Sequence, residues 1–171
     1  MKKIMIVDDN YLSAEGIEKN IDWETLNAEI IHVCYNGTSA IEAMKKEPAD
    51  LIISDIEMPD LDGISMSRQA LEINPMVKII LISAYDKFEY ARRALLLGAL
   101  DYIEKPLDYA YLIQKVKNAF ALMEKEQKNL QLLKQSRPLL TEKFFREITH
   151  RPSSEAAYRL KPYLQYLNRE L

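Results

Sequence analysis

The first 106 residues alternate short apolar runs with segments of helical periodicity. The apolar runs, rich in β-branched residues, predict strands near 3–7, 29–34, 51–54, 78–83 and 100–103. Between them, apolar residues recur at helical spacing and Asn, Pro or Gly soon follows, which predicts helices near 11–20, 38–46, 64–73 and 88–97. This alternation is typical of a doubly wound α/β domain. The third and fourth runs are apolar enough to be covered on both faces, which indicates interior strands.

Polar residues follow four of these apolar runs, at the point where each run ends. They are, in chain order, Asp8 with Asp9, Asp55, Ser83, and Lys105 with Pro106. Because the carboxyl ends of neighbouring parallel strands lie at one edge of a sheet, we expect these groups to converge. Each also has a simpler interpretation: the aspartates can cap a helix or begin a turn, and Lys105 can lie in an inert loop. Their joint order along the chain favours a common site.

Three carboxylates at one sheet edge require a compensating cation. Asp8, Asp9 and Asp55 would otherwise repel one another. Hard divalent ions such as Mg²⁺ prefer carboxylate, carbonyl and water oxygens, so the sequence predicts a Mg²⁺ site. A carboxylate is ionised at neutral pH and needs no base to attack a phosphoryl group, which makes Asp55 the candidate nucleophile.

Further groups at the predicted edge can bind the oxygens of a phosphoryl group. Lys105 can form an ion pair with one oxygen, while the Ser83 hydroxyl and the backbone N–H of Ala84 can donate to the others. The small side chain of Ala84 leaves room for the group to approach. The pattern therefore predicts metal-assisted phosphoryl transfer.

Four motifs together resemble the receiver domain of two-component response regulators, over residues 3 to about 120. They are Val-Asp-Asp-Asn at 7–10, Asp-Ile-Glu-Met-Pro-Asp-Leu-Asp-Gly at 55–63, Ser-Ala at 83–84 and Gly-Ala-Leu-Asp-Tyr-Ile-Glu-Lys-Pro at 98–106. The resemblance implies a flavodoxin-like sheet of five parallel strands in the order 2-1-3-4-5, with a C-terminal helical extension. We therefore expect a receiver domain at 1–122 and a helical linker or extension at 123–171, the start of a region leading to an effector domain.

The resemblance also implies how the phosphoryl group is received. Asp55 takes it from a sensor histidine kinase, so the domain is a phosphoacceptor rather than an enzyme. Asp9 and Asp55 ligate Mg²⁺ together with the backbone carbonyl of Glu57, and Asp8 assists through water. The long charged side chain of Glu57 can reach the phosphoryl group or an attacking water, which leaves self-dephosphorylation and the lifetime of the aspartyl phosphate open.

A switch is implied in the same way. In the family, the hydroxyl at Ser83 moves to the phosphoryl group and the ring at Tyr102 turns inward, altering the surface around the fourth helix, fifth strand and fifth helix. An aromatic residue in a half-buried strand can also serve packing alone. Lys105 reads the phosphoryl charge, and the bond to Pro106 is usually cis.

Two segments look like a Gram-positive-type subgroup of receivers that carry a C-terminal AraC-type DNA-binding domain: Asp22-Trp23 and Ser83-Ala-Tyr-Asp-Lys-Phe-Glu-Tyr-Ala. No helix-turn-helix can be placed in residues 107–171, so we expect transcription regulation and DNA binding only through a domain absent from this sequence. A stand-alone receiver acting by protein contact is the alternative. An aspartyl phosphohydrolase is a weaker one, because such enzymes place a second carboxylate where this chain has Asn10.

Residues 107–171 differ in charge and pattern from the rest. They carry 12 Lys and Arg against 7 Asp and Glu, whereas residues 1–106 carry 11 against 19. No Gly or Pro interrupts 108–134, and we expect Pro138 to end this helix. An apolar face follows at 139–149, then a loop, then a helix that the sequence ends without a stop signal, as if cut within an element.

A stripe of apolar residues along 108–134 has two interpretations. Its apolar residues follow one another at alternating spacings of three and four positions, and Glu126 interrupts the series. They are Leu112, Val116, Ala119, Met123, Leu130 and Leu133. The stripe can be the seam of a homodimeric coiled coil. Alternatively, the first half of the helix packs on its own receiver and the second half is a solvated linker. A homodimer through the receiver itself is also open.

The sequence favours a cytoplasmic protein with no membrane partner. The first apolar stretch stops after four residues at Asp8, too short for a signal peptide or a membrane span. The single cysteine, Cys34, cannot form an internal disulfide and is expected to pack as a small apolar group.

Overall fold

The computed structural model describes residues 1–84 and 99–150, with side chains described as far as residue 132. The elements are β1 (Lys2–Val7), α1 (Tyr11–Asn20), β2 (Ala28–Cys34), α2 (Gly37–Lys46), β3 (Leu51–Asp55), α3 (Gly63–Ile73), β4 (Lys78–Ser83), β5 (Asp101–Glu104) and α5 (Tyr109–His150). The helix expected at 88–97 lies outside the described residues. So do the loop and the last helix expected within 151–171.

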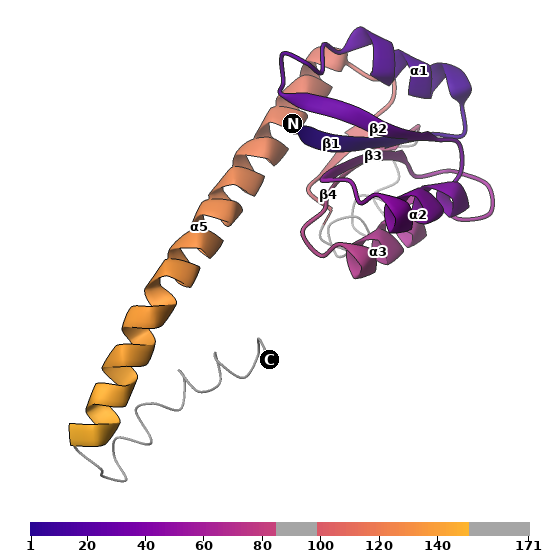
Figure 1. Ribbon diagram of the computed structural model, residues 1–171. Helices are drawn as coiled ribbons and strands as arrows, with labels where there is room; N and C mark the ends of the chain where they lie inside the picture. Colours follow the sequence, from indigo (N-terminus) through magenta and orange to yellow (C-terminus); the bar gives the residue numbers. More distant parts are fainter. Residues whose placement is uncertain (85–98, 151–171) are drawn as a thin grey trace. The chain divides into compact units, whose positions relative to one another are not determined.

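The five strands form one parallel sheet in the order β2-β1-β3-β4-β5 (Figure 1). This confirms the doubly wound fold and its strand order. Val7 of β1 lies opposite Ser54 of β3, and Asp55 lies opposite Ile82 of β4. The carboxyl ends of three neighbouring strands are therefore level, which brings the residue after Val7 close to Asp55.

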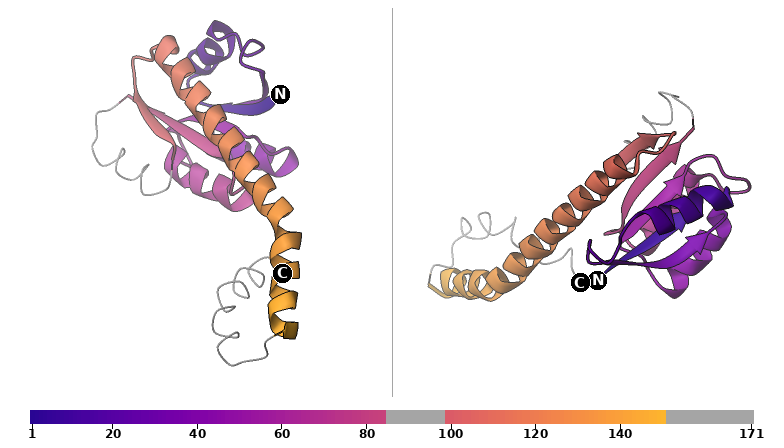
Figure 2. Two further views of the ribbon diagram at one scale, coloured as in Figure 1. Left: turned by 90° about the vertical axis from the view of Figure 1, so that its left-hand side faces the viewer. Right: turned by 90° about the horizontal axis from the view of Figure 1, so that it is seen from above.

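The pleat of the sheet divides the apolar residues between two layers of helices. Met5, Ile52 and Leu81 join a buried cluster with residues of α2 and α3. The alternate residues of the same strands point to the opposite face, and both β3 and β4 are buried there as well, as their uninterrupted apolar runs predict. Figures 1 and 2 show α2 and α3 side by side on one face.

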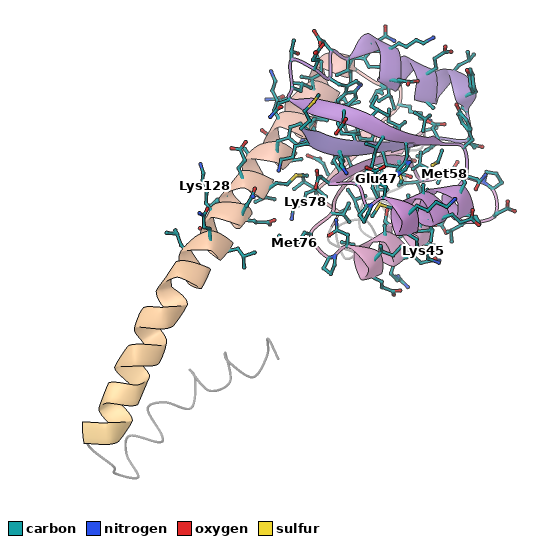
Figure 3. The ribbon with its side chains drawn as sticks, viewed as in Figure 1. Lys45, Glu47, Met58, Met76, Lys78 and Lys128 are labelled. Carbon is teal, nitrogen blue, oxygen red and sulfur yellow. The ribbon has the colours of Figure 1, made fainter. Side chains whose placement is uncertain are left out.

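The first turns of α5 lie beside α1, on the face opposite α2 and α3. There the side chain of Tyr109 lies directly against Gly16 of α1. Side chains fill the space between the sheet and its helices (Figure 3). The sheet therefore lies between two layers of helices. Cys34 is buried at the end of β2, and burial raises the pKa of its thiol.

Helices α1, α2, α3 and α5 each begin at a capping side chain that the sequence supplies, which for α5 is Asp108. The side-chain oxygen of Asn10 accepts from the backbone N–H groups of Leu12 and Ser13 at the start of α1. Asn36 and Asp62 accept in the same way at the starts of α2 and α3. Each cap satisfies N–H groups that the helix itself leaves without a partner. The capping residues thus fix where the chain turns from the sheet edge into each helix.

The helix expected to end at Pro138 does not end there. The α5 backbone remains helical to His150, so that part of the sequence prediction is wrong. Proline removes one backbone hydrogen bond, but the residues around it include strong helix formers such as Leu139, Leu140 and Glu142, and no glycine follows to end the helix.

The apolar stripe is buried where α5 begins. Leu112, Val116 and Ala119 have no exposed surface, which favours packing against the α/β domain over a dimer seam for this part of the helix. The chain divides into two compact units, Met1–Leu122 and Met123–Leu171. Among the described residues, no helix combines the length and the apolar character that crossing a membrane requires.

Two glycines offer a matched test of how tightly the chain packs near the sheet edge. A methyl group at Gly63 would collide with the backbone carbonyl of Asp55, whereas one at Gly16 would approach most closely the end of a side chain, the hydroxyl of Tyr109. We expect Gly63→Ala to lower the free energy of unfolding by about 1–3 kcal/mol because the backbone must shift.

The control, Gly16→Ala, should change that free energy by less than about 1 kcal/mol, since alanine also favours a helix interior. Urea unfolding followed by fluorescence of the buried Trp23 measures both. Equal losses for the two variants would contradict the packing argument.

Candidate functional site

The polar groups predicted at the strand ends do lie together. Asp8 follows β1, Asp55 ends β3, Ser83 ends β4 and Lys105 follows β5. Asp8, Asp55 and Ser83 are buried, with exposed fractions of 1%, 7% and 0%. The backbone N–H of Lys105 donates to the carbonyl of Ser83 at 2.8 Å, which fixes the lysine to the neighbouring strand. Four segments far apart in sequence thus form one buried polar cluster.

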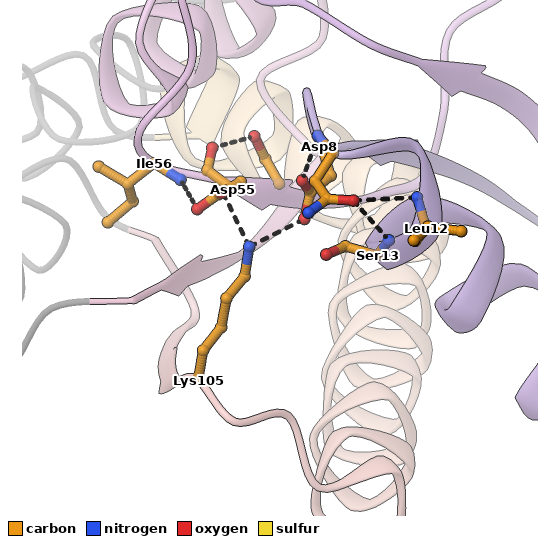
Figure 4. A network of polar contacts seen from close by, with 8 residues as sticks. Asp8, Leu12, Ser13, Asp55, Ile56 and Lys105 are labelled. Carbon is orange, nitrogen blue, oxygen red and sulfur yellow. Dashed lines mark hydrogen bonds and ion pairs between the residues drawn. The ribbon is translucent and has the colours of Figure 1, made fainter.

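Lys105 joins the two buried carboxylates. Its Nζ lies 2.9 Å from Oδ2 of Asp55 and 3.1 Å from Oδ2 of Asp8 (Figure 4). Burial acts to lower the pKa of Lys105, but its hydrogen bonds with the two aspartates and their charges outweigh burial and raise the pKa. Lys105 is therefore a cation at neutral pH, and it partly balances the negative charge of the site.

Burial disfavours the ionised form of Asp8. Burial raises the pKa of Asp8, although the N–H of Asn10 and the Lys105 ammonium both act to lower it. Its Oδ1 accepts the Asn10 N–H at 2.9 Å. Because the net shift is upward, the ionised form of Asp8 is less favourable here than in water. One ammonium group does not fully compensate the buried charge.

A third carboxylate completes an acidic group. One carboxylate oxygen from each of Asp8, Asp9 and Asp55 lies within 4.8 Å of the others, and Asp9 is exposed. Oxygen donors in this number and proximity fit a hard divalent cation that keeps several waters. The capping interpretation of Asp8 and Asp9 is wrong, because the side chain of Asn10 caps α1.

The carboxylate of Asp55 is held at both oxygens. Oδ1 accepts the backbone N–H of Ile56 at 2.8 Å, and Oδ2 contacts Lys105 (Figure 4). The fully buried Ser54 hydroxyl donates to the backbone carbonyl of Asp55 at 2.8 Å. We did not predict Ser54 as a site residue. Its only sign in the sequence is that it is the one hydroxyl in an otherwise apolar run, which does not distinguish it from a serine that fills space.

A backbone hydrogen bond joins the two ends of the loop that follows Asp55. The N–H of Gly63 donates to the carbonyl of Ile56 at 2.9 Å, and Ile56 and Met58 are both buried. Glu57 lies between these two anchored residues. Asp60 adopts a left-handed conformation with φ of 67°, which Asp tolerates better than most residues. The backbone beside Asp55 is thus fixed by packing and hydrogen bonding.

Three other predicted residues lie in or just after β4 and β5. Ala84 is exposed directly after β4, Tyr102 is half-buried in β5, and the Lys105–Pro106 peptide bond is cis. A cleft of about 350 Å³ adjoins the cluster. Asp8 and Lys105 line it together with mostly apolar residues: Leu12, Ser13, Ile17, Ile82, Pro106, Leu107 and Tyr109.

Comparison with known proteins identifies relatives over the first unit. The sequence profile of the family described as "Response regulator receiver domain" matches residues 4–117. The transcriptional regulatory protein YesN of Bacillus subtilis, whose function is uncharacterised, is 29% identical over 126 residues, which is 74% of this chain and 34% of that protein. The chain thus spans about a third of that relative.

Solved structures of response regulators are similar to the first unit as well. The receiver domain of AraT, a response regulator from Geobacillus stearothermophilus, superposes with a TM-score of 0.70 at 34% identity, covering 74% of this chain and 98% of that one. A two component transcriptional regulator AraC from Clostridium phytofermentans gives 0.66 at 30% identity, covering 75% and 99%.

The buried charge of Asp8 leads to a prediction about stability. Since the folded pKa of Asp8 is raised, its ionised form costs stability above that pKa, and the cost disappears as the pH falls towards the ordinary value of 3.8. Asp8→Asn should therefore raise the free energy of unfolding at neutral pH without divalent cations, by about 1 kcal/mol.

The gain should shrink on acidification, as measured by urea unfolding across the pH range. Asp9→Asn is the matched control because that carboxylate is exposed, and it should change stability little. A destabilised Asp8→Asn protein would show that the ion pair with Lys105 outweighs the cost of burial.

Proposed function

The chain belongs to the response regulator receiver family, and from this premise we propose that it accepts a phosphoryl group on Asp55 from a sensor histidine kinase in the cytoplasm. The observation that carries the proposal is the contact of one lysine, Lys105, with two buried aspartates at the carboxyl edge of the sheet. The ammonium can pair with a dianionic group, and the carboxylates can hold a divalent cation that offsets the remaining negative charge.

Mg²⁺ is the cofactor that we propose. Asp9 and Asp55 would hold the ion together with the backbone carbonyl of Glu57, and Asp8 would assist through water. A bound Mg²⁺ would neutralise charge on the phosphoryl oxygens. The residues suit it because the oxygen donors lie close together and the buried charge of Asp8 is incompletely compensated.

The transfer step uses the carboxylate of Asp55 as nucleophile. An oxygen of Asp55 attacks the phosphorus of the donor phosphohistidine, an O–P bond forms as the N–P bond breaks, and the leaving imidazole takes up a proton. Lys105, already 2.9 Å from this carboxylate, pairs with a phosphoryl oxygen. The Ser83 hydroxyl and the Ala84 N–H donate to the other oxygens.

The conformational change that we propose after phosphorylation involves Ser83 and Tyr102. Ser83 ends the strand next to β5, and Tyr102 lies half-buried in β5 itself. A hydroxyl drawn to the phosphoryl group would leave space for the ring of Tyr102 to turn inward, and the surface of β5 and the start of α5 would change. Lys105 links this movement to the charge on Asp55.

The output that we propose is transcription. Similar proteins are named transcriptional regulators, and each is longer than the region that matches this chain. In this proposal an AraC-type DNA-binding domain beyond the receiver contacts DNA, and 123–171 acts as a helical linker. A homodimer through the receiver, or through the part of α5 beyond the buried stripe, would deliver paired domains. A stand-alone receiver is the alternative.

A phosphohydrolase is less well supported. The residue two positions after Asp8 is Asn10, an amide whose oxygen accepts two backbone N–H groups of α1. The amide does not titrate near neutral pH, so it cannot act as a general acid or base. A role in receiving and retaining the phosphoryl group therefore suits the site better.

Labelling with a small phosphodonor tests the acceptor residue. With acetyl phosphate and Mg²⁺, the protein should gain one phosphoryl group, and Asp55→Asn should abolish the gain because the amide is not a nucleophile. Intact-protein mass spectrometry measures the mass change. Asp60→Asn is the matched control: it removes an exposed carboxylate from the same loop, where Asn tolerates the left-handed backbone.

Removal of Mg²⁺ with a chelator should prevent labelling of the wild type and of Asp60→Asn alike. Wild-type labelling of the Asp55→Asn protein would refute the assignment of the acceptor.

The role of Lys105 can be separated from phosphorylation itself. In Lys105→Ala, Asp55 should still be labelled, but NMR shifts of Ser83 and Tyr102 that accompany labelling of the wild type should be lost, because no cation links the phosphoryl group to β5. Lys115→Ala is the control, since Lys115 pairs with Asp101 at 2.7 Å instead. Unchanged shifts in the Lys105 variant would remove its linking role.

A further inference from the structure

Ser54 is a polar residue in an apolar environment, with no exposed surface. It lies in β3 between Val7 of β1 and Leu81 of β4, both of which belong to the buried apolar cluster. A hydroxyl in such surroundings is costly unless it is hydrogen-bonded. Its partner is the backbone carbonyl oxygen of Asp55, at 2.8 Å.

That hydrogen bond holds the peptide group whose N–H is also hydrogen-bonded to the Asp55 side chain. The C=O of Asp55 and the N–H of Ile56 belong to one planar peptide unit. The N–H end donates to Oδ1 of Asp55 at 2.8 Å (Figure 4). It also donates to the carbonyl oxygen of Ile82 at 2.9 Å. When one N–H group donates to two acceptors, a small rotation of the peptide plane weakens at least one of the two hydrogen bonds.

The carbonyl end of this unit is also confined sterically. Gly63 approaches the Asp55 carbonyl so closely that a Cβ at that position would collide with it. The carbonyl therefore lies between the Ser54 hydroxyl and the Gly63 backbone. With Oδ1 held by Ile56, Oδ2 is the oxygen that contacts Lys105.

We propose that Ser54 is a positioning residue for phosphoryl transfer, acting through the Asp55–Ile56 peptide unit to orient the Asp55 carboxylate. This rests on the proposed function of Asp55. The hydroxyl does not touch the phosphoryl group; it holds the carbonyl end of the unit so that the N–H end keeps Oδ1 in place. Loss of the hydroxyl frees the unit to rotate and spreads the carboxylate over several orientations.

The test compares two fully buried serines. Ser67 of α3 also has no exposed surface, and its hydroxyl also donates to a backbone carbonyl, that of Gly63, at 2.6 Å. Ser54→Ala and Ser67→Ala therefore each remove one buried hydrogen bond, but only the first removes a bond to the Asp55 peptide unit itself. With acetyl phosphate and Mg²⁺, we expect Ser54→Ala to be labelled about tenfold more slowly than the wild type. Ser67→Ala should keep the wild-type rate.

Two readouts separate positioning from general loss of stability. The amide proton of Ile56 should shift in Ser54→Ala, as its bond to Oδ1 weakens, and remain unchanged in Ser67→Ala. Ser54→Thr retains the hydroxyl and should keep a rate close to that of the wild type. If Ser54→Ala does not fold, Ser54→Cys replaces it, because a thiol of similar size is only a weak donor.

The outcomes are distinct. Equal labelling rates for Ser54→Ala and the wild type overturn the inference, and so does equal slowing in the two serine variants, which would indicate destabilisation alone. Failure of the wild-type protein to be labelled on Asp55 would instead refute the proposed function. Slow labelling confined to Ser54→Ala, with the Ile56 shift and rescue by threonine, supports the inference.

Discussion

The balance of charge at the carboxyl edge of the sheet is the constraint on which the rest of the site depends. Asp8 and Asp55 are almost fully buried, and one ammonium group contacts both. The lysine can reach them only because β5 returns beside β4 and is tied to Ser83 through the Lys105 N–H. The upward shift of the Asp8 pKa shows that this balance is incomplete. The site is therefore suited to a further cation and, through Lys105, to an incoming anion.

Backbone geometry beside Asp55 is as constrained as the charges. The peptide unit after Asp55 contacts a serine hydroxyl at one end and a carboxylate oxygen at the other. Gly63 closes the loop from the opposite side, and there is no room for a larger residue. Rigid support of this kind keeps a nucleophile in one orientation at little cost during the reaction. The fold thus supplies orientation while the carboxylate supplies the chemistry.

The long helix α5 illustrates how packing decides between two interpretations of one pattern. Its stripe of apolar residues has the spacing of a coiled coil, yet Leu112, Val116 and Ala119 are fully buried within the receiver unit. Local sequence also misled at Pro138, where the backbone continues as a helix. A single proline costs one hydrogen bond and some strain, which strong helix formers on both sides can offset.

The resemblance to receiver domains implied the strand order. The sequence by itself determined the strands, the described helices of the first unit and the gathering of Asp8, Asp55, Ser83 and Lys105 at one edge. These follow from hydrophobic period, capping residues and the rule that parallel strands end on the same side. Only the tertiary structure decided which atoms meet. Ser54 is indistinguishable in sequence from a serine that merely fills space, because its role depends on a peptide plane set by Gly63 and Ile82. Long-range packing, and not local pattern, left Asp8 with a buried charge beside Lys105.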